Sequence, residues 1–446
     1  MAGPTAAPLR RRRMIMVMLF CLMLISFQDK GILGLAAKPM MTDLGIDEAR
    51  YGTIASSFYL LFTVSSVLVG FIINRAAAKW LLAVLAVVWS AAQLPVLLPA
   101  VGVAGLIATR ILLGAGEGPV VASVNNTMFG WFRSEERALP ASVLTMGSAL
   151  GVIIGAPLME AVISSLGWRA AFGILGAIGL VWVAVWLVTG RDGPFSGRAP
   201  AAPTARNESA GPAASAEPDE PRVPLRKILL SPTWLAATIG GFATYWGLAV
   251  ALSFLALFLE EHAHFSRTAV SFLVGLPSAT AIVLVLVAGF CSQRLLKAGR
   301  SRWLAQGVIG GVSLLIAAAG MVVQTRTGAA VPLVIAMALA FSAANVLTPL
   351  AGVAIGDICP PRQRGAAMGI WYGVINLASI VAPQITGILV ASAPDAGTGF
   401  QYAFDLTAAV TVAGAVVVLM LMRTDRDARR LRPAAPRDDG MAAVRA

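Results

Sequence analysis

Twelve long apolar stretches constrain the fold of this chain more than any other feature of its sequence. Each is about 20 residues or longer, which is the length that an α-helix needs to cross the ~30 Å hydrocarbon core of a bilayer. Lipid offers backbone amides no hydrogen-bond partner, so each stretch is expected to be a helix. The predicted spans are 14–37, 51–73, 80–99, 102–128, 138–163, 168–189, 231–259, 268–293, 303–323, 330–355, 365–392 and 400–422.

The composition agrees with an all-α membrane protein and excludes a soluble globular domain. Of the 446 residues, 58% are hydrophobic and only 13% are charged, whereas about 25% of the residues of soluble domains are charged. The net charge of +12 is explained by orientation in the membrane and attraction to anionic lipid, so we expect no nucleic-acid partner.

The positions of Lys and Arg predict the orientation of the chain. With the N-terminus inside, 27 of the 34 Lys and Arg residues fall in cytoplasmic segments, five fall outside, and two lie within spans. This asymmetry fits the rule that cytoplasmic loops carry the positive charge. We therefore expect a multi-pass protein of the cell (inner) membrane with both termini in the cytoplasm.

A segment rich in Pro, Ala and charge, from 191 to 228, separates the spans into two sets of six and is expected to be a disordered linker. Short motifs repeat across it: "GFIINR" after the second span matches "GFCSQR" after the eighth. Such internal repeats are typical of transporters with a central site. The expected parts are a basic N-terminus at 1–13, six-helix bundles at 14–190 and 229–423, the linker between them, and a basic tail at 424–446.

Four ionisable residues stand inside the apolar spans: Asp29 and Lys30 in the first, and Arg110 and Glu117 in the fourth. A charge at the centre of a bilayer costs on the order of 3 kcal/mol, so such residues face a cavity or pair across helices and are functional by default. Counted along the helices, the two pairs reach similar depths. We expect them to meet in a water-filled cavity, where Asp29 and Glu117 bind protons while Lys30 and Arg110 attract a carboxylate. The alternative is a structural network that joins the two spans.

Several stretches resemble the major facilitator superfamily, and more narrowly its anion:cation symporter family, which includes sugar-acid transporters. They are "DKGILGLAAKPMMTDLGI", "RILLGAGEGP", "WFRSEERALPASVLTMGSALGVIIGAPL", "LGWRAAF" and "INLASIVAPQITG". The resemblance implies twelve transmembrane helices in two six-helix pseudo-symmetric halves. It also implies that the family's coupling acids and basic residues correspond to the four charges named above. The chain departs from the family pattern at Asn74, Lys30 and Phe62, where Asp, Arg and Tyr are usual.

Weaker candidates come from polar residues inside other spans. Asn376 matches a family position that contacts substrate, although a buried interhelical hydrogen bond explains it equally well. Thr145 and Tyr245 are candidate cavity residues, with packing as the alternative for the tyrosine. Arginines and an aspartate beside the short loops are expected to act as conformational latches whose ion pairs stabilise one access state. These are Arg75, Arg137, Arg294, Asp357 and Arg364.

The sequence contains no motif that indicates an enzyme. The chain has no phosphate-binding loop and no His or Cys cluster with metal spacing, so we expect neither an enzyme nor a cofactor or metal site. The sequence predicts a monomeric secondary transporter that imports a small organic anion with protons. Two alternatives remain: a proton antiporter that exports drugs or anionic metabolites, and a membrane sensor that does not transport.

Overall fold

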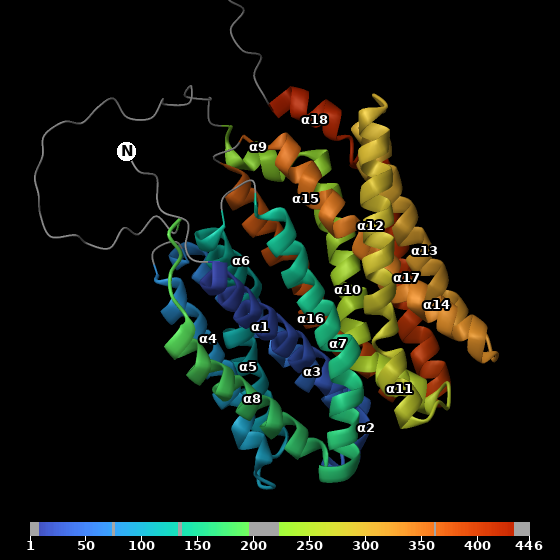
Figure 1. Ribbon diagram of the computed structural model, residues 1–446. Coiled ribbons are helices and arrows are strands. Elements are labelled where there is room, and N and C mark those ends of the chain that lie inside the picture. The colour runs from blue at the N-terminus through green and yellow to red at the C-terminus, as the bar shows by residue number, and fades with distance from the viewer. Residues whose placement is uncertain (1–8, 74–75, 133–135, 196–222, 361–362, 432–446) are drawn as a thin grey trace, which may run out of the picture.

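The computed structural model describes residues 9–73, 76–132, 136–195, 223–360 and 363–431. Within these ranges the chain is helical and contains no β-strand (Figure 1). Twelve helical segments are long and apolar enough to cross a membrane, and each overlaps one of the twelve predicted spans. The prediction of an all-α membrane protein with twelve spans is confirmed.

The helices form two halves of six spans each. The first half contains α1 (Leu9–Leu35), α2 (Ala37–Leu44), α3 (Glu48–Ile72), α4 (Ala78–Gln93), η1 (Leu94–Leu97), α5 (Val103–Glu117), α6 (Val120–Trp131), α7 (Ala138–Leu166) and α8 (Trp168–Thr189). The second half contains α9 (Leu225–Leu229), α10 (Pro232–Glu261), α11 (Arg267–Leu273), α12 (Leu276–Lys297), η3 (Trp303–Val308), α13 (Ile309–Gln324), α14 (Ala330–Ser342), η4 (Ala343–Val346), α15 (Leu347–Ile358), α16 (Arg364–Ser392), α17 (Ala396–Leu421) and α18 (Thr424–Leu431).

The two halves repeat the same irregularities. The fourth span is broken between α5 and α6 at Gly118 and Pro119, and the tenth span is interrupted by η4 between α14 and α15. Proline lacks an amide hydrogen and clashes with the preceding turn, which explains the first break. The fifth and eleventh spans, α7 and α16, each carry an internal proline, Pro157 and Pro383. The repeated breaks are what pseudo-symmetric halves would show.

Besides α2, which follows the first span, two short helices lie in segments that were not predicted to be spans. α9 falls within the segment predicted as a linker, and α18 falls within the predicted basic tail. Asp427 of α18 is buried and accepts hydrogen bonds from the backbone nitrogen of Thr233 at 2.9 Å and from its hydroxyl at 2.7 Å. Because Thr233 lies in the first turn of α10, this carboxylate caps the start of a transmembrane helix from a distant part of the chain.

Within the first half, α1 packs closely against α7 along a row of glycines. The row comprises Gly147, Gly151 and Gly155, which contact Phe20, Leu24 and Gln28 of α1 respectively. A Cβ atom built on Gly151 would lie only 2.3 Å from the carbonyl oxygen of Leu24. Small residues at this spacing allow the two helices to approach closely.

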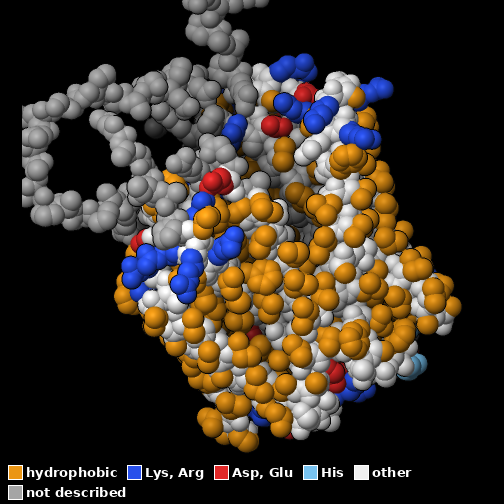
Figure 2. Space-filling model, in the orientation of Figure 1, with side chains coloured by type: hydrophobic (Ala, Val, Ile, Leu, Met, Phe, Trp, Pro, Cys, Tyr) orange, Lys and Arg blue, Asp and Glu red, His pale blue; other side chains and the backbone are white. Residues whose placement is uncertain are grey.

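The two halves meet mainly at one end of the molecule. We call the end that holds Leu9 and Leu431 the basic end, and the opposite end, which holds α2 and α11, the far end (Figure 1). Lys and Arg side chains gather at the basic end, while the flanks are apolar (Figure 2). Figure 2 also shows a recess between the halves that opens toward the basic end.

Three polar contacts cross between the halves toward the far end. Lys38 Nζ of α2 lies 3.0 Å from Glu261 Oε1 of α10. The Tyr51 hydroxyl of α3 donates to the backbone oxygen of Ser253 in α10 at 2.7 Å. Arg267 of α11 bridges the halves through Glu160 of α7 and Glu260 of α10, as described below.

Backbones approach closely at the same seam. A Cβ on Gly34 of α1 would lie 2.5 Å from the carbonyl oxygen of Leu252 in α10, and one on Gly52 of α3 would lie equally close to that of Pro383 in α16. The far-end seam is therefore closed by direct backbone packing as well as by polar contacts.

The first prediction concerns the packing of α1 against α7. Replacing Gly151 with Leu would force the two helices apart and should lower the free energy of unfolding by about 1–3 kcal/mol, as overpacking does elsewhere. Thermal unfolding of the purified protein in detergent measures the effect. Gly369→Leu in α16 is the matched control, because a Cβ there meets no atom within 4 Å. Equal midpoints for the two variants would contradict the packing role of the stripe.

Candidate functional site

The structure brings the four intramembrane charges together in the first half. Asp29 and Lys30 lie on α1, while Arg110 and Glu117 lie on α5, with Glu117 as its last residue. Asp29, Arg110 and Glu117 are 1%, 3% and 0% exposed, and the Lys30 side chain is 9% exposed. The charges interact electrostatically with one another, so that two acids and two bases balance in a site with almost no access to solvent.

An ion pair between the two spans forms the centre of this site. Lys30 Nζ lies 2.9 Å from Glu117 Oε2 and also donates to the hydroxyl of Ser26 at 2.8 Å. The ammonium group stands over the rings of Phe27 and Phe62, at 4.6 and 5.8 Å from their centres. Aromatic faces favour a cation that has lost its water, so they add to the stability of the buried lysine.

The second acid and base have different partners. Asp29 Oδ2 accepts a hydrogen bond at 3.2 Å from Gln93 Nε2, which stands at the end of α4. The guanidinium carbon of Arg110 lies 4.4 Å from the centre of the Phe172 ring. Asp29 Oδ1 and Glu117 Oε1 are buried without a hydrogen-bond partner among the described residues. Each carboxyl group therefore keeps one oxygen that can take a proton or a new donor.

Two cavities of very different size adjoin this region. A small one of about 10 Å³ is lined by Asp29, Lys30 and Arg110, by residues of α3, and by Leu252 and Ser253 of the second half. It is roughly the size of one water molecule. A large one of about 880 Å³ lies between the halves and is lined by residues of α1, α7, α10 and α12, among others. None of the four charged residues lines the large cavity.

The expected single water-filled cavity around the charges is therefore replaced by two separate spaces. Neighbouring residues on a helix point about 100° apart. Phe27, Gln28 and Gly31 face the large cavity, while Asp29 and Lys30 point toward α5 and the core of the first half. Helix α1 thus forms the wall between the cavity and the charges.

The other predicted binding residues are spread over the interface. Thr145 and Tyr245 line the large cavity from α7 and α10. Thr145 donates its hydroxyl proton to the carbonyl of Ala141 in its own helix. Asn376 of α16 lines neither cavity, and its amide donates to the carbonyl of Tyr372 at 2.8 Å. The structure thus brings Lys30 and Arg110 to the charged site, and Thr145 and Tyr245 to the cavity.

The predicted latch residues make contacts inside their own halves. Arg137 donates to the carbonyl of Phe132 and Arg364 to that of Cys359, in each case five residues back along the chain. The repeated contact is a further sign of pseudo-symmetry. Arg294 stands over the ring of Phe290, 4.5 Å from its centre.

The acidic latch residue also stays within its half. Asp357 lies 3.5 Å from Arg302 Nε and accepts a hydrogen bond from Gln306 at 3.3 Å. Arg75 falls outside the described residues. At the basic end, the ion pair Arg12–Glu136 likewise joins two residues of the first half.

Some residues of the site escaped prediction. Gln93, the partner of Asp29, and Ser26, a partner of Lys30, are uncharged and therefore did not stand out in the spans. A list of every amide side chain inside a span would have included Gln93. Among the described residues, no three His, Cys, Asp or Glu side chains are arranged to hold a metal ion.

Fold and site together define a polytopic membrane protein with a buried charge network beside a cavity between two repeated halves. The family model of the Major Facilitator Superfamily matches residues 19–250 and 237–443. The chain belongs to the major facilitator superfamily, and it is a transporter rather than an enzyme.

Its curated relatives include three bacterial proteins named as transporters of hexuronate, D-galactonate and, with the word probable, sulfoacetate. It is 27% identical over 416 residues to the hexuronate transporter of Bacillus subtilis, covering 92% of this chain and 94% of that one. It is 26% identical to the D-galactonate transporter of Escherichia coli O6:H1, covering 94% and 97%. A probable sulfoacetate transporter of Cupriavidus necator is 25% identical, covering 86% and 88%.

Solved structures of distant relatives share the fold. A bacterial homologue of the lysosomal transporter Spinster, in an inward-facing and unoccupied conformation, superposes with a TM-score of 0.76 at 17% identity, covering 94% of this chain and 99% of that one. A D-xylose-proton symporter gives a TM-score of 0.71 at 14% identity, covering 92% and 98%. The expected major facilitator fold is confirmed.

The second prediction tests the buried ion pair. Lys30→Met leaves Glu117 buried without its ion-pair partner and should lower the free energy of unfolding by roughly 3–5 kcal/mol, whereas the double variant Lys30→Met/Glu117→Gln should recover most of that loss. Thermal unfolding of the unmodified protein, the single variants Lys30→Met and Glu117→Gln, and the double variant gives the coupling free energy between the two residues. Lys38→Met is the control, since the exposed pair of Lys38 with Glu261 contributes less than about 1 kcal/mol. Additive effects of the two substitutions would contradict the pairing.

Proposed function

We propose that the protein is a secondary active transporter that imports an organic anion together with protons. The observation that carries this proposal is the buried pair of Lys30 and Glu117, which lies beside the seam between the halves. The names of the relatives, transporters of hexuronate, D-galactonate and sulfoacetate, support an anionic substrate. The proposed protein is a monomer in the cell membrane, with its two bundles, linker and tails arranged as predicted and its termini in the cytoplasm.

Proton binding would act by releasing a cation. While Glu117 is ionised, it holds Lys30 at 2.9 Å and leaves the ammonium group unavailable to a substrate. A proton on Glu117 removes that attraction, and the carboxylate of the substrate then becomes the partner of Lys30. Asp29 and Arg110 are proposed to form the second acid and base of the same cycle. Substrate and proton together replace one buried ion pair by another, so the site is neutral before either binds and again when both are bound.

Alternating access follows from the contacts between the halves. The described structure has a closed far-end seam and a recess toward the basic end. With the predicted orientation, this is the inward-facing state. The latch residues Arg137, Asp357 and Arg364 then belong to the open side, where they pair within their halves and become available to the other half when that side closes.

A second candidate is proton-coupled export of an anionic compound. The large cavity, with its mainly apolar lining, suits a compound with an apolar body and is compatible with either direction of transport. The two candidates differ in direction only. Proteoliposomes with pH gradients of opposite sign distinguish them, since import requires protons and anion to move the same way.

The third prediction concerns coupling. Glu117→Gln and Asp29→Asn should abolish uphill accumulation driven by a proton gradient, while exchange of labelled for unlabelled anion down its own gradient continues. Gln and Asn cannot carry the proton that links the two fluxes. Accumulation and proton flux are measured together in proteoliposomes.

A matched carboxylate provides the control. Glu48 stands in the first turn of α3, away from the charged site, and Glu48→Gln should accumulate anion like the unmodified protein. If Glu117→Gln and Asp29→Asn both accumulated anion uphill with unchanged pH dependence, the proposed coupling would be wrong.

The fourth prediction concerns the far-end seam. Arg267 Nε lies 3.8 Å from Glu160 Oε1 in the first half and 3.7 Å from Glu260 Oε2 in the second half. Arg267→Gln removes this bridge and should raise the population open at the far end by up to roughly fivefold, because partly exposed ion pairs contribute about 1 kcal/mol at most. Spin labels at Thr42 and Ser392, in a chain with its three cysteines replaced by serine, report the distance between the halves.

The control uses an arginine whose partner lies in its own half. Arg326 is 2.7 Å from Asp405, and both belong to the second half near the far end. Arg326→Gln should leave the distance distribution unchanged. An equal shift in both variants would show that Arg267 has no special role in closing the seam.

A further inference from the structure

The lining of the large cavity carries information about the substrate that the charged site does not. The cavity holds about 880 Å³, and no charged side chain of the described residues lines it. Its walls are mainly apolar, and its polar side chains are neutral. The cation proposed to bind the anionic group, Lys30, lies on the other side of α1 from this cavity.

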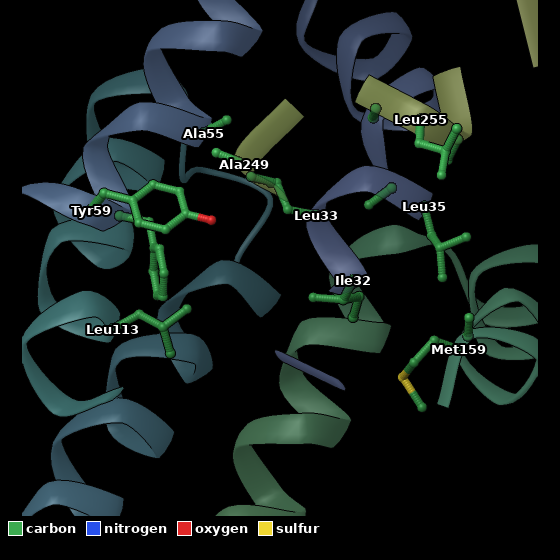
Figure 3. Close-up of a cluster of buried hydrophobic side chains, with 14 of the residues drawn as sticks. Ile32, Leu33, Leu35, Ala55, Tyr59, Leu113, Met159, Ala249 and Leu255 are labelled. Carbon is green, nitrogen blue, oxygen red and sulfur yellow. The ribbon is translucent and has the colours of Figure 1, made fainter. Parts of the chain in front are cut away.

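The polar residues of the lining are unevenly distributed along the membrane normal. Asn125, Thr145, Asn345 and Thr348 lie on the basic-end halves of their spans, near the mouth of the cavity. The deeper part, toward the closed far-end seam, is lined by Ile32, Leu35, Met159, Leu252, Leu255 and Phe341. In Figure 3, Leu35, Met159 and Leu255 face one another on one side of Ile32. The closed end of the cavity is therefore an apolar pocket.

Several of the polar groups are already occupied. The Gln28 amide donates to the carbonyl of Gly155 at 3.3 Å, and the Asn345 amide donates to that of Phe341 at 3.0 Å. The hydroxyl protons of Thr145 and Ser148 go to carbonyls of their own helix. The deep part of the cavity has few polar side chains, among them Gln28 and Ser278.

A polyhydroxylated sugar acid would be poorly matched to this pocket. Each of its hydroxyl groups loses water on binding and needs a partner in the protein, and a buried hydroxyl without one opposes binding. An aryl or alkyl group has no such requirement and gains from leaving water. The apolar pocket therefore discriminates against the type of substrate that the names of two relatives describe.

The wall between the cavity and the charges is thin at one point. Gly31 lines the cavity directly after Lys30 in the chain, and a Cβ there would meet no atom within 4 Å. Phe27 lines the cavity and also carries the Lys30 ammonium group 4.6 Å from its ring centre. A carboxylate at this point would be separated from Lys30 only by the Phe27 ring and the backbone of α1, with the rest of the molecule in the apolar pocket.

We propose that the substrate is an amphipathic organic anion, namely a carboxylate with an aryl or alkyl body, rather than a polyhydroxylated sugar acid. This inference rests on the proposed function, because the anionic group is the one that Lys30 receives. It adds the chemical class of the remainder of the molecule, which the apolar pocket selects.

The test compares two classes of anion on the full-length protein. Phenylacetate and cyclohexanecarboxylate should raise the thermal unfolding midpoint of the detergent-purified protein, and D-glucuronate and D-galactonate should do so only at concentrations at least about tenfold higher. Uptake into proteoliposomes should follow the same order, with protein-free vesicles to correct for passive entry. Tighter binding of the sugar acids, or no binding of the apolar acids, would overturn the inference.

A pair of methionines on one helix provides matched variants. Met159 lies in the apolar pocket, and Met146 lines the cavity about 20 Å nearer its mouth. Met159→Gln places an amide of similar size in the pocket and should weaken binding of phenylacetate roughly tenfold, with no such loss for D-glucuronate. Met146→Gln, which lies outside the apolar pocket, should weaken binding of phenylacetate much less than Met159→Gln does. Equal effects of the two variants would contradict the assignment of the pocket.

These experiments test the proposed substrate class and the proposed proton coupling separately. If the apolar acids bind and their uptake ignores the proton gradient even in the unmodified protein, the proposed proton coupling is wrong and the substrate class stands. If the sugar acids are accumulated with protons in preference to the apolar acids, the coupling stands and the substrate class is wrong.

Discussion

The ion pair between Lys30 and Glu117 is the contact on which the rest of the structure depends. Both groups are removed from water inside a membrane, where neither is stable without the other. Their helices, α1 and α5, are held in register by this pair and by the nearby Asp29 and Arg110. Two acids and two bases make a neutral set, and a neutral set can accept a proton and an anion together without becoming charged. This requirement for neutrality links the stability of the first half to the proposed transport cycle.

The seam between the halves lies next to the charged site, and in the proposed transport cycle it links that local chemistry to two access states. Leu252 and Ser253 of the second half line the small cavity next to the charges, and Ser253 also accepts the hydrogen bond of Tyr51. A change of partner at Lys30 therefore occurs within one residue layer of the far-end contacts. The seam is closed by backbone packing at Gly34 and Gly52, which leaves little tolerance for small displacements. Such tightly packed interfaces open as a unit rather than gradually.

The large cavity and the charged site divide recognition between them. In the proposed function, the charged site receives the anionic group of the substrate. The cavity, which is lined by α1, α7, α10 and the neighbouring helices, is proposed to receive the remainder of the molecule. Relatives at 25–27% identity can keep the first and change the second. We therefore infer the chemical class of the rest of the substrate from the residues that line the cavity of this chain, and not from the names of its relatives.

The sequence by itself determined the number of spans, the two halves and the four intramembrane charges. The reason is that hydrocarbon offers backbone amides no hydrogen-bond partner and makes an unpaired charge costly. The span ends were less certain: α1 begins five residues earlier than predicted, since a helix continues past the apolar stretch wherever its polar end reaches the interface. Only the tertiary structure decided which charge pairs with which, that α1 separates them from the large cavity, and that uncharged Gln93 joins them. Those outcomes depend on the rotation and packing of whole helices, which is set by contacts such as the glycine row of α7, between residues more than 100 positions apart. A local pattern of hydrophobicity carries no information about such contacts.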